Sequence, residues 1–261
     1  MEKILTIDIG NTNIATCLWD GDKMNRLKSF QTDLNASFEA LKDSFLSVLM
    51  SYEDNKKTEL IAGSVISCVV PSIAETAKEA LSSVTGHTPV MVSHELDLGI
   101  NFDLYDKKSL GADRIVDVVG AVQLYKAPVI VCDLGTCTTI SAVDSNKNFI
   151  GGMICPGVQT SLNALHSRVP HLPEITAAQT DTLIGQDTSS ALLSGAVVGT
   201  ASMLAEITDR LCKAPEMKGA SLILTGGNAP FVFPWIGEKE KAYHEPDLIM
   251  KGLREIYTNF C

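Results

Sequence analysis

ILTIDIGNTNI (residues 4–14) has a counterpart in VIVCDLGTCTTI (residues 129–140). Each stretch reads as an apolar strand, an Asp-x-Gly turn and a strand that returns beside the first. The aspartates of the two turns, Asp8 and Asp133, lie 125 residues apart, close to half of the 261-residue chain. No linker or low-complexity segment separates the two regions, so the spacing indicates a duplicated α/β unit rather than two unrelated domains.

The hydrophobic pattern outside the two turns predicts strands and helices in both halves. Residues 93–110 are polar and irregular, and a turn is expected at Asp144–Lys147. Strands are expected at residues 3–9, 14–20, near 24–31, 60–66, 89–92, 139–143, 148–154 and 220–224. Helices are expected at residues 36–50, from Pro71 to about 84, 110–125 and 188–212. The alternation predicts an α/β fold whose two halves each contain a sheet and helices.

The Asp-x-Gly turns have the chemistry of a phosphate site. Glycine lets a phosphate approach the backbone, successive N–H groups form an anion-binding concavity, and aspartate offers a hard oxygen to Mg²⁺. A single such turn is most often an ordinary turn. Two copies, each after a buried strand in a duplicated unit, favour a nucleotide clamp with the site in a cleft between the halves. Thr225-Gly226-Gly227 follows a further apolar strand, which fits either a nucleotide contact or an ordinary strand-to-helix turn.

Gly111-Ala112-Asp113-Arg114 opens the helix expected at 110–125. A carboxylate in the first turn is favoured by the helix dipole, whereas an arginine there is electrostatically misplaced. One interpretation is a capping Asp113 beside a solvated Arg114. The other makes Asp113 a general base toward a hydroxyl group and Arg114 a clamp on a carboxylate.

Composition excludes several classes of protein. The net charge is −10, with a pI near 4.9, which argues against nucleic-acid wrapping and against a membrane surface held by basic residues. No apolar run of about 18 residues predicts a transmembrane helix, and Asp8 comes too early for a signal peptide. The seven cysteines include no CxxC pair, so we expect reduced thiols and a cytoplasmic location. His166 and His171 are five residues apart, which does not place them on one helix face, so we expect no histidine metal site.

Five segments together resemble a known family. They are Asp8-Ile9-Gly10-Asn11-Thr12, Gly111-Ala112-Asp113-Arg114, Asp133-Leu134-Gly135-Thr136, Gly151-Gly152-Met153-Ile154-Cys155-Pro156-Gly157 and Thr225-Gly226-Gly227. In this order they are similar to type III pantothenate kinases, and the likeness runs from Ile4 to Leu253. The Asp-x-Gly turns are shared with acetate and sugar kinases, heat-shock ATPases and actin. The Gly111–Arg114 and Gly151–Gly157 segments together narrow the resemblance to this family.

The resemblance implies a fold and a reaction. The fold is a pair of ribonuclease H-like (actin-like ATPase) halves with a cleft between them: residues 1–115, and residues 116–261 with dimerisation helices. The reaction is ATP-dependent phosphorylation of the primary hydroxyl of pantothenate to 4'-phosphopantothenate, the first step of coenzyme A biosynthesis. Family members are homodimers with the pantothenate pocket at the subunit interface.

The resemblance also implies roles for individual residues. Asp113 is implied as the catalytic proton acceptor, Asp8 lies near Mg²⁺, and Asp133 binds a monovalent cation, K⁺ or NH₄⁺. The implied ATP contacts are Asp8, Ile9, Gly10, Asn11, Thr12, Asn13, Ile14, Ala15, Thr136, Gly226 and Gly227. The implied pantothenate contacts are Gly111, Ala112, Asp113, Arg114 and Thr188.

The chain departs from the family in one segment. Many members carry Tyr-x-Asn-Pro before Gly-x-Asp-Arg. This chain has Leu104 at the position of that tyrosine, and Asp106 and Lys107 at the positions of Asn-Pro. Its own tyrosine, Tyr105, lies one residue after the family position. The rival interpretations are an actin-like module that uses ATP to switch shape and a sugar kinase. A length of 261 residues leaves little room for the inserted subdomains of the former, and Arg114 suits a carboxylate better than a neutral sugar.

Overall fold

The chain divides into two compact units in the computed structural model, which describes residues 3–51, 61–237 and 241–260. Unit 1 comprises Met1–Gly99, Asp106–Gln123 and Leu248–Cys261, and unit 2 comprises Ile100–Tyr105 and Leu124–Asp247. This division by contacts differs from a division after residue 115, because most of helix α3 (Ala112–Tyr125) and all of helix α7 (Leu248–Phe260) belong to unit 1. The boundary after residue 115 stays a prediction about the sequence repeat.

Unit 1 contains a mixed sheet in the order β3-β2-β1-β5-β6, with β4 also paired to β2. The pairs β1–β2, β2–β3 and β2–β4 are antiparallel, while β5 runs parallel to β1 and β6 runs parallel to β5. The strands span Lys3–Ile9 (β1), Asn13–Asp20 (β2), Lys23–Arg26 (β3), Phe30–Gln31 (β4), Ile61–Cys68 (β5) and Val90–Met91 (β6). The single strand predicted near residues 24–31 is thus two short strands, and Leu60 of the predicted 60–66 strand lies outside the described residues.

Unit 2 repeats this order, reading β9-β8-β7-β10-β11. Strands β7, β8 and β9 form an antiparallel meander, and β10 and β11 continue the sheet in parallel from β7. The strands span Val129–Leu134 (β7), Cys137–Val143 (β8), Phe149–Pro156 (β9), Ser221–Thr225 (β10) and Ala242–His244 (β11). Two sheets of matching strand order confirm the mixed α/β fold predicted from the two Asp-x-Gly segments.

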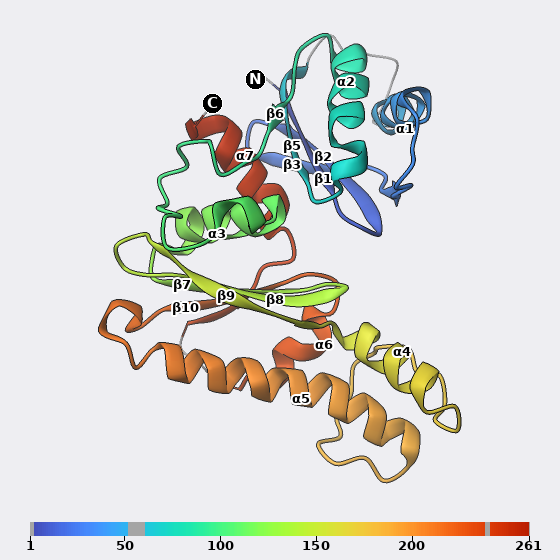
Figure 1. The fold of residues 1–261 in the computed structure, drawn as a ribbon, viewed down its shortest axis with the longest axis vertical. Coiled ribbons are helices and arrows are strands. Elements are labelled where there is room, and N and C mark those ends of the chain that lie inside the picture. Colours follow the sequence, from blue (N-terminus) through green and yellow to red (C-terminus); the bar gives the residue numbers. More distant parts are fainter. Residues whose placement is uncertain (1–2, 52–60, 238–240, 261) are drawn as a thin grey trace. The chain divides into compact units, whose positions relative to one another are not determined.

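Helices α1 (Phe38–Met50) and α2 (Ala74–Thr85) lie side by side against the sheet of unit 1 (Figure 1). The buried residues of this layer include Leu41, Phe45 and Leu81, which pack against inward-facing strand residues such as Ile7 and Ile66. Helix α2 continues a short 3-10 turn at Pro71–Ile73 and ends at Gly86 in the left-handed conformation.

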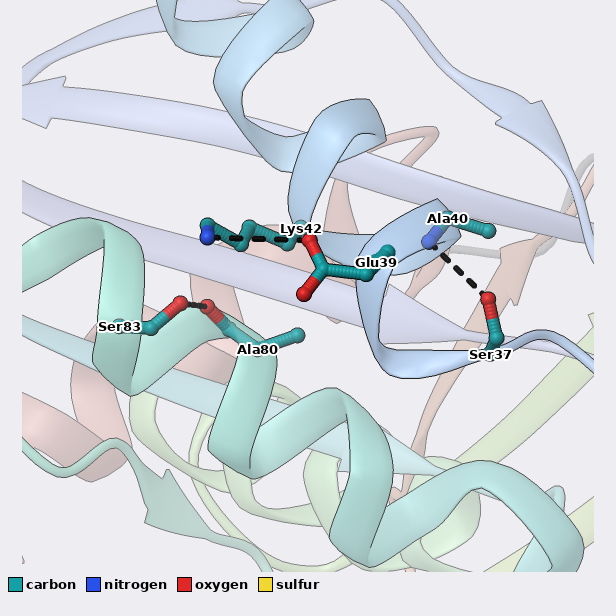
Figure 2. Close-up of polar contacts among 6 residues, drawn as sticks. All are labelled: Ser37, Glu39, Ala40, Lys42, Ala80 and Ser83. Atoms are coloured by element: carbon teal, nitrogen blue, oxygen red, sulfur yellow. Dashed lines mark hydrogen bonds and ion pairs between the residues drawn. The ribbon is translucent and has the colours of Figure 1, made fainter.

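The start of helix α1 is fixed by a side-chain cap (Figure 2). The Ser37 hydroxyl accepts a hydrogen bond from the Ala40 N–H at 3.3 Å, which satisfies a donor that has no partner within the helix. Glu39 and Lys42 pair one turn apart at 3.8 Å, and the Ser83 hydroxyl donates to the Ala80 carbonyl on α2 at 2.7 Å. These surface contacts each stabilise the helices only slightly.

The C-terminal helix α7 is attached to the N-terminal sheet. Met250 accepts a hydrogen bond from the buried Thr6 hydroxyl at 3.4 Å, and the Arg254 guanidinium lies 4.9 Å from the ring of Trp19. Helices α7 and α3 meet at Gly252 and Gly120. A Cβ added to Gly252 would lie 2.5 Å from the Val116 carbonyl oxygen, so only glycine permits this approach of the two helices.

We expect Gly252→Ala to lower the free energy of unfolding, because the new methyl group must push α7 away from α3. Overpacking of this kind costs about 1–3 kcal/mol, measurable as a lower midpoint in urea unfolding. Thr258→Ala, at an exposed position of the same helix, is the matched control. Equal midpoints for the two variants would contradict the assigned packing.

Unit 2 has its core between the sheet and helices α4 (Val158–Arg168), α5 (Thr188–Leu211) and α6 (Ala229–Val232). Val197, Ala201 and Leu204 follow one face of α5 and pack on the sheet, along which α5 runs in Figure 1. Among the described residues, α5 alone has the length and hydropathy of a membrane-crossing helix, and 33% of its most apolar window is buried. Since one face of α5 packs in the core, its apolar character has a structural explanation.

Candidate active site

The first Asp-x-Gly turn is a tight loop of three residues between β1 and β2. The Gly10 N–H donates to the Asn13 carbonyl at 3.0 Å, and the Thr32 hydroxyl donates to the Gly10 carbonyl at 2.7 Å. Asn11, Thr12 and Asn13 are exposed, so a ligand can reach this loop from solvent. The sequence did not single out Thr32, which lies far along the chain and fixes the loop from outside.

Two predicted ATP-contact residues of this loop have buried side chains. Ile9 and Ile14 are both 0% exposed and belong to the core of unit 1. Any contact of theirs with a nucleotide would therefore come from the backbone. Ala15 is half-buried and pairs with Asp8 in the β1–β2 ladder.

The surroundings of Asp8 suit a magnesium ion. Asp8 is in parallel register with Ser67 on β5, and the buried Ser67 hydroxyl has no hydrogen-bond partner. An oxygen that is buried and unsatisfied beside a carboxylate fits a hydrated cation. No group of three or more His, Cys, Asp or Glu side chains suited to a metal occurs in the described part of the chain. Mg²⁺ is typically held by one or two carboxylates, water and substrate phosphates, and Asp8 offers one such carboxylate.

Asp113 lies at the start of helix α3, in its first turn. Its Oδ1 accepts the Arg114 N–H at 2.7 Å, and a Cβ added to Gly111 would lie 2.5 Å from the same oxygen. The carboxylate is thus folded back over Gly111, where only glycine leaves room for it. Burial raises the pKa of Asp113, and the Arg114 N–H and charge partly oppose the rise. A carboxylate with a raised pKa is a stronger proton acceptor at neutral pH.

Arg114 is 5% exposed. The structure thus replaces the interpretation of a solvated arginine with that of a buried one whose charge acts on Asp113. A buried guanidinium beside a carboxylate stabilises the ionised form of that carboxylate.

The second Asp-x-Gly turn, in unit 2, is held by hydrogen bonds from residues that follow β9. Only Gly135 and Thr136 separate β7 from β8, one residue fewer than in the first turn. The Gly157 N–H donates to the Thr136 carbonyl at 3.0 Å, and the Thr160 hydroxyl donates to the same oxygen at 2.7 Å. The Gly151–Gly157 segment therefore supports the turn that contains Thr136.

Gly226 packs directly on Asp133. It has φ +86°, and a Cβ added to it would overlap the Asp133 Oδ1 atom and lie 2.7 Å from the Leu134 nitrogen. The Asn228 side chain donates to the Leu134 and Gly135 carbonyls, each at 3.2 Å. The structure thus brings Asp133, Gly226 and the second turn together. Asn228 was not among the predicted contacts, although its place after Gly-Gly is a signal for a turn-fixing amide.

Thr188 is the first residue of α5 and is positioned by Asp187. The Asp187 carboxylate accepts the Ser190 N–H at 3.0 Å, and this bond and the Ser190 hydroxyl lower the Asp187 pKa. Thr188 and Cys155 line a cavity of about 640 Å³ in unit 2, whose walls are otherwise mostly apolar residues of α4 and α5. Thr188, a predicted pantothenate contact, therefore lines a cavity in unit 2.

The structure also describes Leu104–Lys107, the segment in which the chain departs from the family pattern. Leu104, at the family's tyrosine position, is 65% exposed. Tyr105 packs edge-on against Phe149 in unit 2, with the ring centroids 5.2 Å apart. Asp106 accepts the Lys108 N–H at 3.3 Å and caps the short helix Lys107–Ser109.

The predicted site residues thus form two groups. Unit 1 contains the Asp8–Ala15 segment and the Gly111–Arg114 segment. Unit 2 contains Asp133, Thr136, Thr188, Gly226 and Gly227. The cleft expected between the halves stays a prediction.

Comparison with known proteins gives the family of this chain. The sequence model for "Type III pantothenate kinase" matches residues 4–210. The chain belongs to the type III pantothenate kinase family. A type III pantothenate kinase of Streptomyces coelicolor is 35% identical over 261 residues, covering 97% of each chain. One of Agathobacter rectalis is 32% identical, covering 97% of this chain and 96% of its own.

Solved structures of low sequence identity share the fold of this family member. A putative Baf family transcriptional activator from Campylobacter jejuni aligns with a TM-score of 0.58, at 22% identity and with 98% of each chain covered. A non-polymerising mutant of MamK bound to AMPPNP aligns with a TM-score of 0.52, at 14% identity and with 97% of each chain covered. These likenesses support an actin-like ATPase fold for the type III pantothenate kinase chain.

Proposed function

We propose that the chain is an ATP-dependent phosphotransferase that phosphorylates the primary hydroxyl of pantothenate, giving 4'-phosphopantothenate for coenzyme A biosynthesis. The observation that carries the proposal is Asp113, a carboxylate of raised pKa held over Gly111 at the start of α3 in a chain of the type III pantothenate kinase family. A hydroxyl group that attacks ATP in line with the leaving oxygen is assisted by such a proton acceptor.

In this mechanism Asp113 accepts the proton of the pantothenate hydroxyl as that oxygen attacks the γ-phosphorus of ATP, and the bond from this phosphorus to the β–γ bridging oxygen breaks to release ADP. General-base assistance of this kind contributes about 10²–10⁴-fold to the rate. Arg114 keeps Asp113 ionised between turnovers, because its buried positive charge favours the carboxylate form.

The two glycine turns bind the phosphates of ATP. In unit 1 the exposed residues Asn11, Thr12 and Asn13 donate to phosphate oxygens, and Asp8 with Ser67 would hold Mg²⁺. In unit 2 Thr136 and the Gly226–Gly227 segment contact the nucleotide, and Asp133 binds a monovalent cation, K⁺ or NH₄⁺. When bound, these cations neutralise charge on the transferring phosphoryl group, which an acidic chain of net charge −10 cannot do with distant side chains.

The proposal includes a homodimer in the cytoplasm, with neither nucleic acid nor membrane as a partner. Support comes from apolar residues exposed on unit 2, among them Ile154 at 65% and Ile184 at 77%. Gly195 and Gly199 on α5 face open space and line the same concavity as Thr188. A second copy that covers this surface would bury it and complete the pocket around Thr188.

The test is an ADP-release assay with pantothenate, with N-acetylhexosamines and without an acceptor, each with and without K⁺. We expect release only with pantothenate, and a higher rate with K⁺. ADP release that needs no acceptor would support an ATP-driven switch instead. Release that depends on N-acetylhexosamine would support a sugar kinase.

A further inference from the structure

The two sheets each place a hydroxyl side chain beside the turn aspartate. In unit 1, β5 runs parallel to β1, and Ser67 is the register partner of Asp8. In unit 2, β10 runs parallel to β7, and Thr225 is the register partner of Asp133. Strands β5 and β10 hold the same position in the two sheet orders, each next to the strand that carries the aspartate. The Asp133–Thr225 pair of unit 2 is therefore equivalent to the Asp8–Ser67 pair of unit 1.

In unit 2 the aspartate and the hydroxyl lie on the same face of the sheet. Leu134 and Leu224, the sequence neighbours of Asp133 and Thr225, belong to the core between the sheet and α5. Because successive side chains of a strand point to opposite faces, Asp133 and Thr225 point away from that core. Neighbouring strands are about 4.8 Å apart, so the two side chains are close enough to share one ligand.

Unit 1 has the same arrangement. Ile9 and Ile66, the sequence neighbours of Asp8 and Ser67, belong to the core on the side of α1 and α2, so Asp8 and Ser67 share the other face. Ser67 is 0% exposed with an unsatisfied hydroxyl, and Thr225 is 5% exposed. Burying a hydroxyl costs free energy unless a polar group or an ion meets it. Its occurrence beside the aspartate in both halves indicates a role in binding rather than in packing.

Gly226 brings the Asp133 carboxylate to the end of β10. This glycine follows Thr225 directly, has φ +86°, and a Cβ added to it would overlap the Asp133 Oδ1 atom. The carboxylate therefore lies over the end of β10, in space that only glycine leaves open. A carboxylate held there beside a hydroxyl fits a cation, because both groups offer hard oxygen atoms.

The charge of the pair suits a monovalent cation. The Asp133 carboxylate balances one positive charge, and the neutral Thr225 hydroxyl adds a ligand oxygen without adding charge. K⁺ is bound in proteins by oxygen atoms that replace its hydration shell, and NH₄⁺ donates hydrogen bonds to the same oxygens. At Asp8 the phosphates of ATP supply the further negative charge that Mg²⁺ requires.

We propose that Thr225 is a ligand of the monovalent cation, binding it through Oγ1 together with Asp133, as the counterpart of Ser67 at the magnesium site. This inference rests on the proposed function, which assigns K⁺ or NH₄⁺ to Asp133, and it adds a second side chain to that cation site.

The test measures cation binding as thermal stability, without turnover. Tm is determined by calorimetry with Mg²⁺ and AMPPNP while K⁺ replaces N-methylglucamine at constant ionic strength. A cation that binds only the folded chain raises Tm as its concentration rises. Thr225→Val keeps the shape of threonine without the oxygen. We expect it to need at least about tenfold more K⁺ for the same rise in Tm, because the contact of an oxygen with a charge is lost. Thr225→Ser, which keeps the hydroxyl, should stay within about threefold of the unaltered chain.

Ser221→Ala is the matched control. Ser221 is a buried hydroxyl residue on the same strand and the same sheet face as Thr225, but its register partner is Val129 instead of an aspartate. The K⁺ dependence of its Tm should equal that of the unaltered chain, even where its Tm without K⁺ is lower.

Ser67→Ala separates the two cations. At fixed K⁺ it should need more Mg²⁺ for the same rise in Tm, and its K⁺ dependence should be unchanged, whereas Thr225→Val should show the reverse. An unchanged K⁺ dependence in Thr225→Val would overturn the inference. An equal loss of K⁺ dependence in Ser221→Ala or Ser67→Ala would also overturn it, because the effect would then not belong to the Thr225 hydroxyl.

ADP release with pantothenate, measured on the same preparation, distinguishes this inference from the proposed function. A chain that phosphorylates pantothenate but gains no stability from K⁺ would overturn the cation site and this inference, while leaving the kinase activity established. A chain that gains stability from K⁺ through Thr225 but does not phosphorylate pantothenate would overturn the proposed function and support the cation site.

Discussion

Asp113→Asn should lower kcat for pantothenate phosphorylation by about 10²–10⁴-fold, the usual contribution of a general base. Asparagine has the shape of aspartate and its carbonyl oxygen can still accept the Arg114 N–H, so the start of α3 should keep its structure. The amide group of the asparagine cannot accept the proton of the pantothenate hydroxyl. The measurement pairs kcat with the Kd for ATP from calorimetry, which should change less than about threefold because the Asp-x-Gly turns are untouched. Unchanged turnover would remove Asp113 from the catalytic role.

The pH dependence of kcat/KM tests the same residue without substitution. Only the ionised carboxylate accepts a proton, so activity should fall as pH falls through the Asp113 pKa. Because burial raises that pKa, the acidic limb should lie above the ordinary aspartate value of about 3.9. In Asp113→Asn this limb should disappear from the residual activity. A limb at the ordinary value would show that the carboxylate is solvated during turnover.

Many of the strands and the two Asp-x-Gly turns were predictable because they depend on local sequence. An apolar strand, an Asp-x-Gly turn and a return strand occur twice, and the two sheets have matching strand order. Helices α4 and α7 were not predicted. Helix α7 belongs to the unit formed by the N-terminal sheet, through contacts such as that of Met250 with Thr6. The buried residues of α7 have helical spacing, so the helix itself was readable from the sequence, whereas its pairing with the N-terminal sheet was not.

The side-chain environment of the site was less predictable than its backbone. The sequence placed Arg114 at a helix start but did not show that it is buried, and it gave no pairing for Ser67 or Asn228. Lys107 was visible only as a departure from the family pattern. Burial and electrostatic roles are thus properties of tertiary packing, which composition and spacing do not specify.

Gly226→Ala should both destabilise unit 2 and weaken nucleotide binding. Alanine at φ +86° is strained, and its Cβ would overlap the Asp133 carboxylate and press on the Leu134 nitrogen. Strained backbone of this kind costs about 1–3 kcal/mol, which lowers Tm by several degrees in a chain of this size. Asp133 must move to relieve the overlap, and displacing a site group by about 1 Å can cost about 10²-fold in rate.

The matched comparison is Gly227→Ala in the neighbouring residue. Gly227 lacks a positive φ, and a Cβ added to it meets nothing within 4 Å, so its Tm should stay close to that of the unaltered chain. Measuring Tm by calorimetry, and KM for ATP with increasing K⁺, separates the two positions.

If Asp133 holds the monovalent cation, Gly226→Ala should also lose stimulation by K⁺, because the carboxylate is displaced. Equal Tm values for the two variants would contradict the contact of Gly226 with Asp133. Retained K⁺ stimulation in a destabilised Gly226→Ala would instead place the cation away from Asp133.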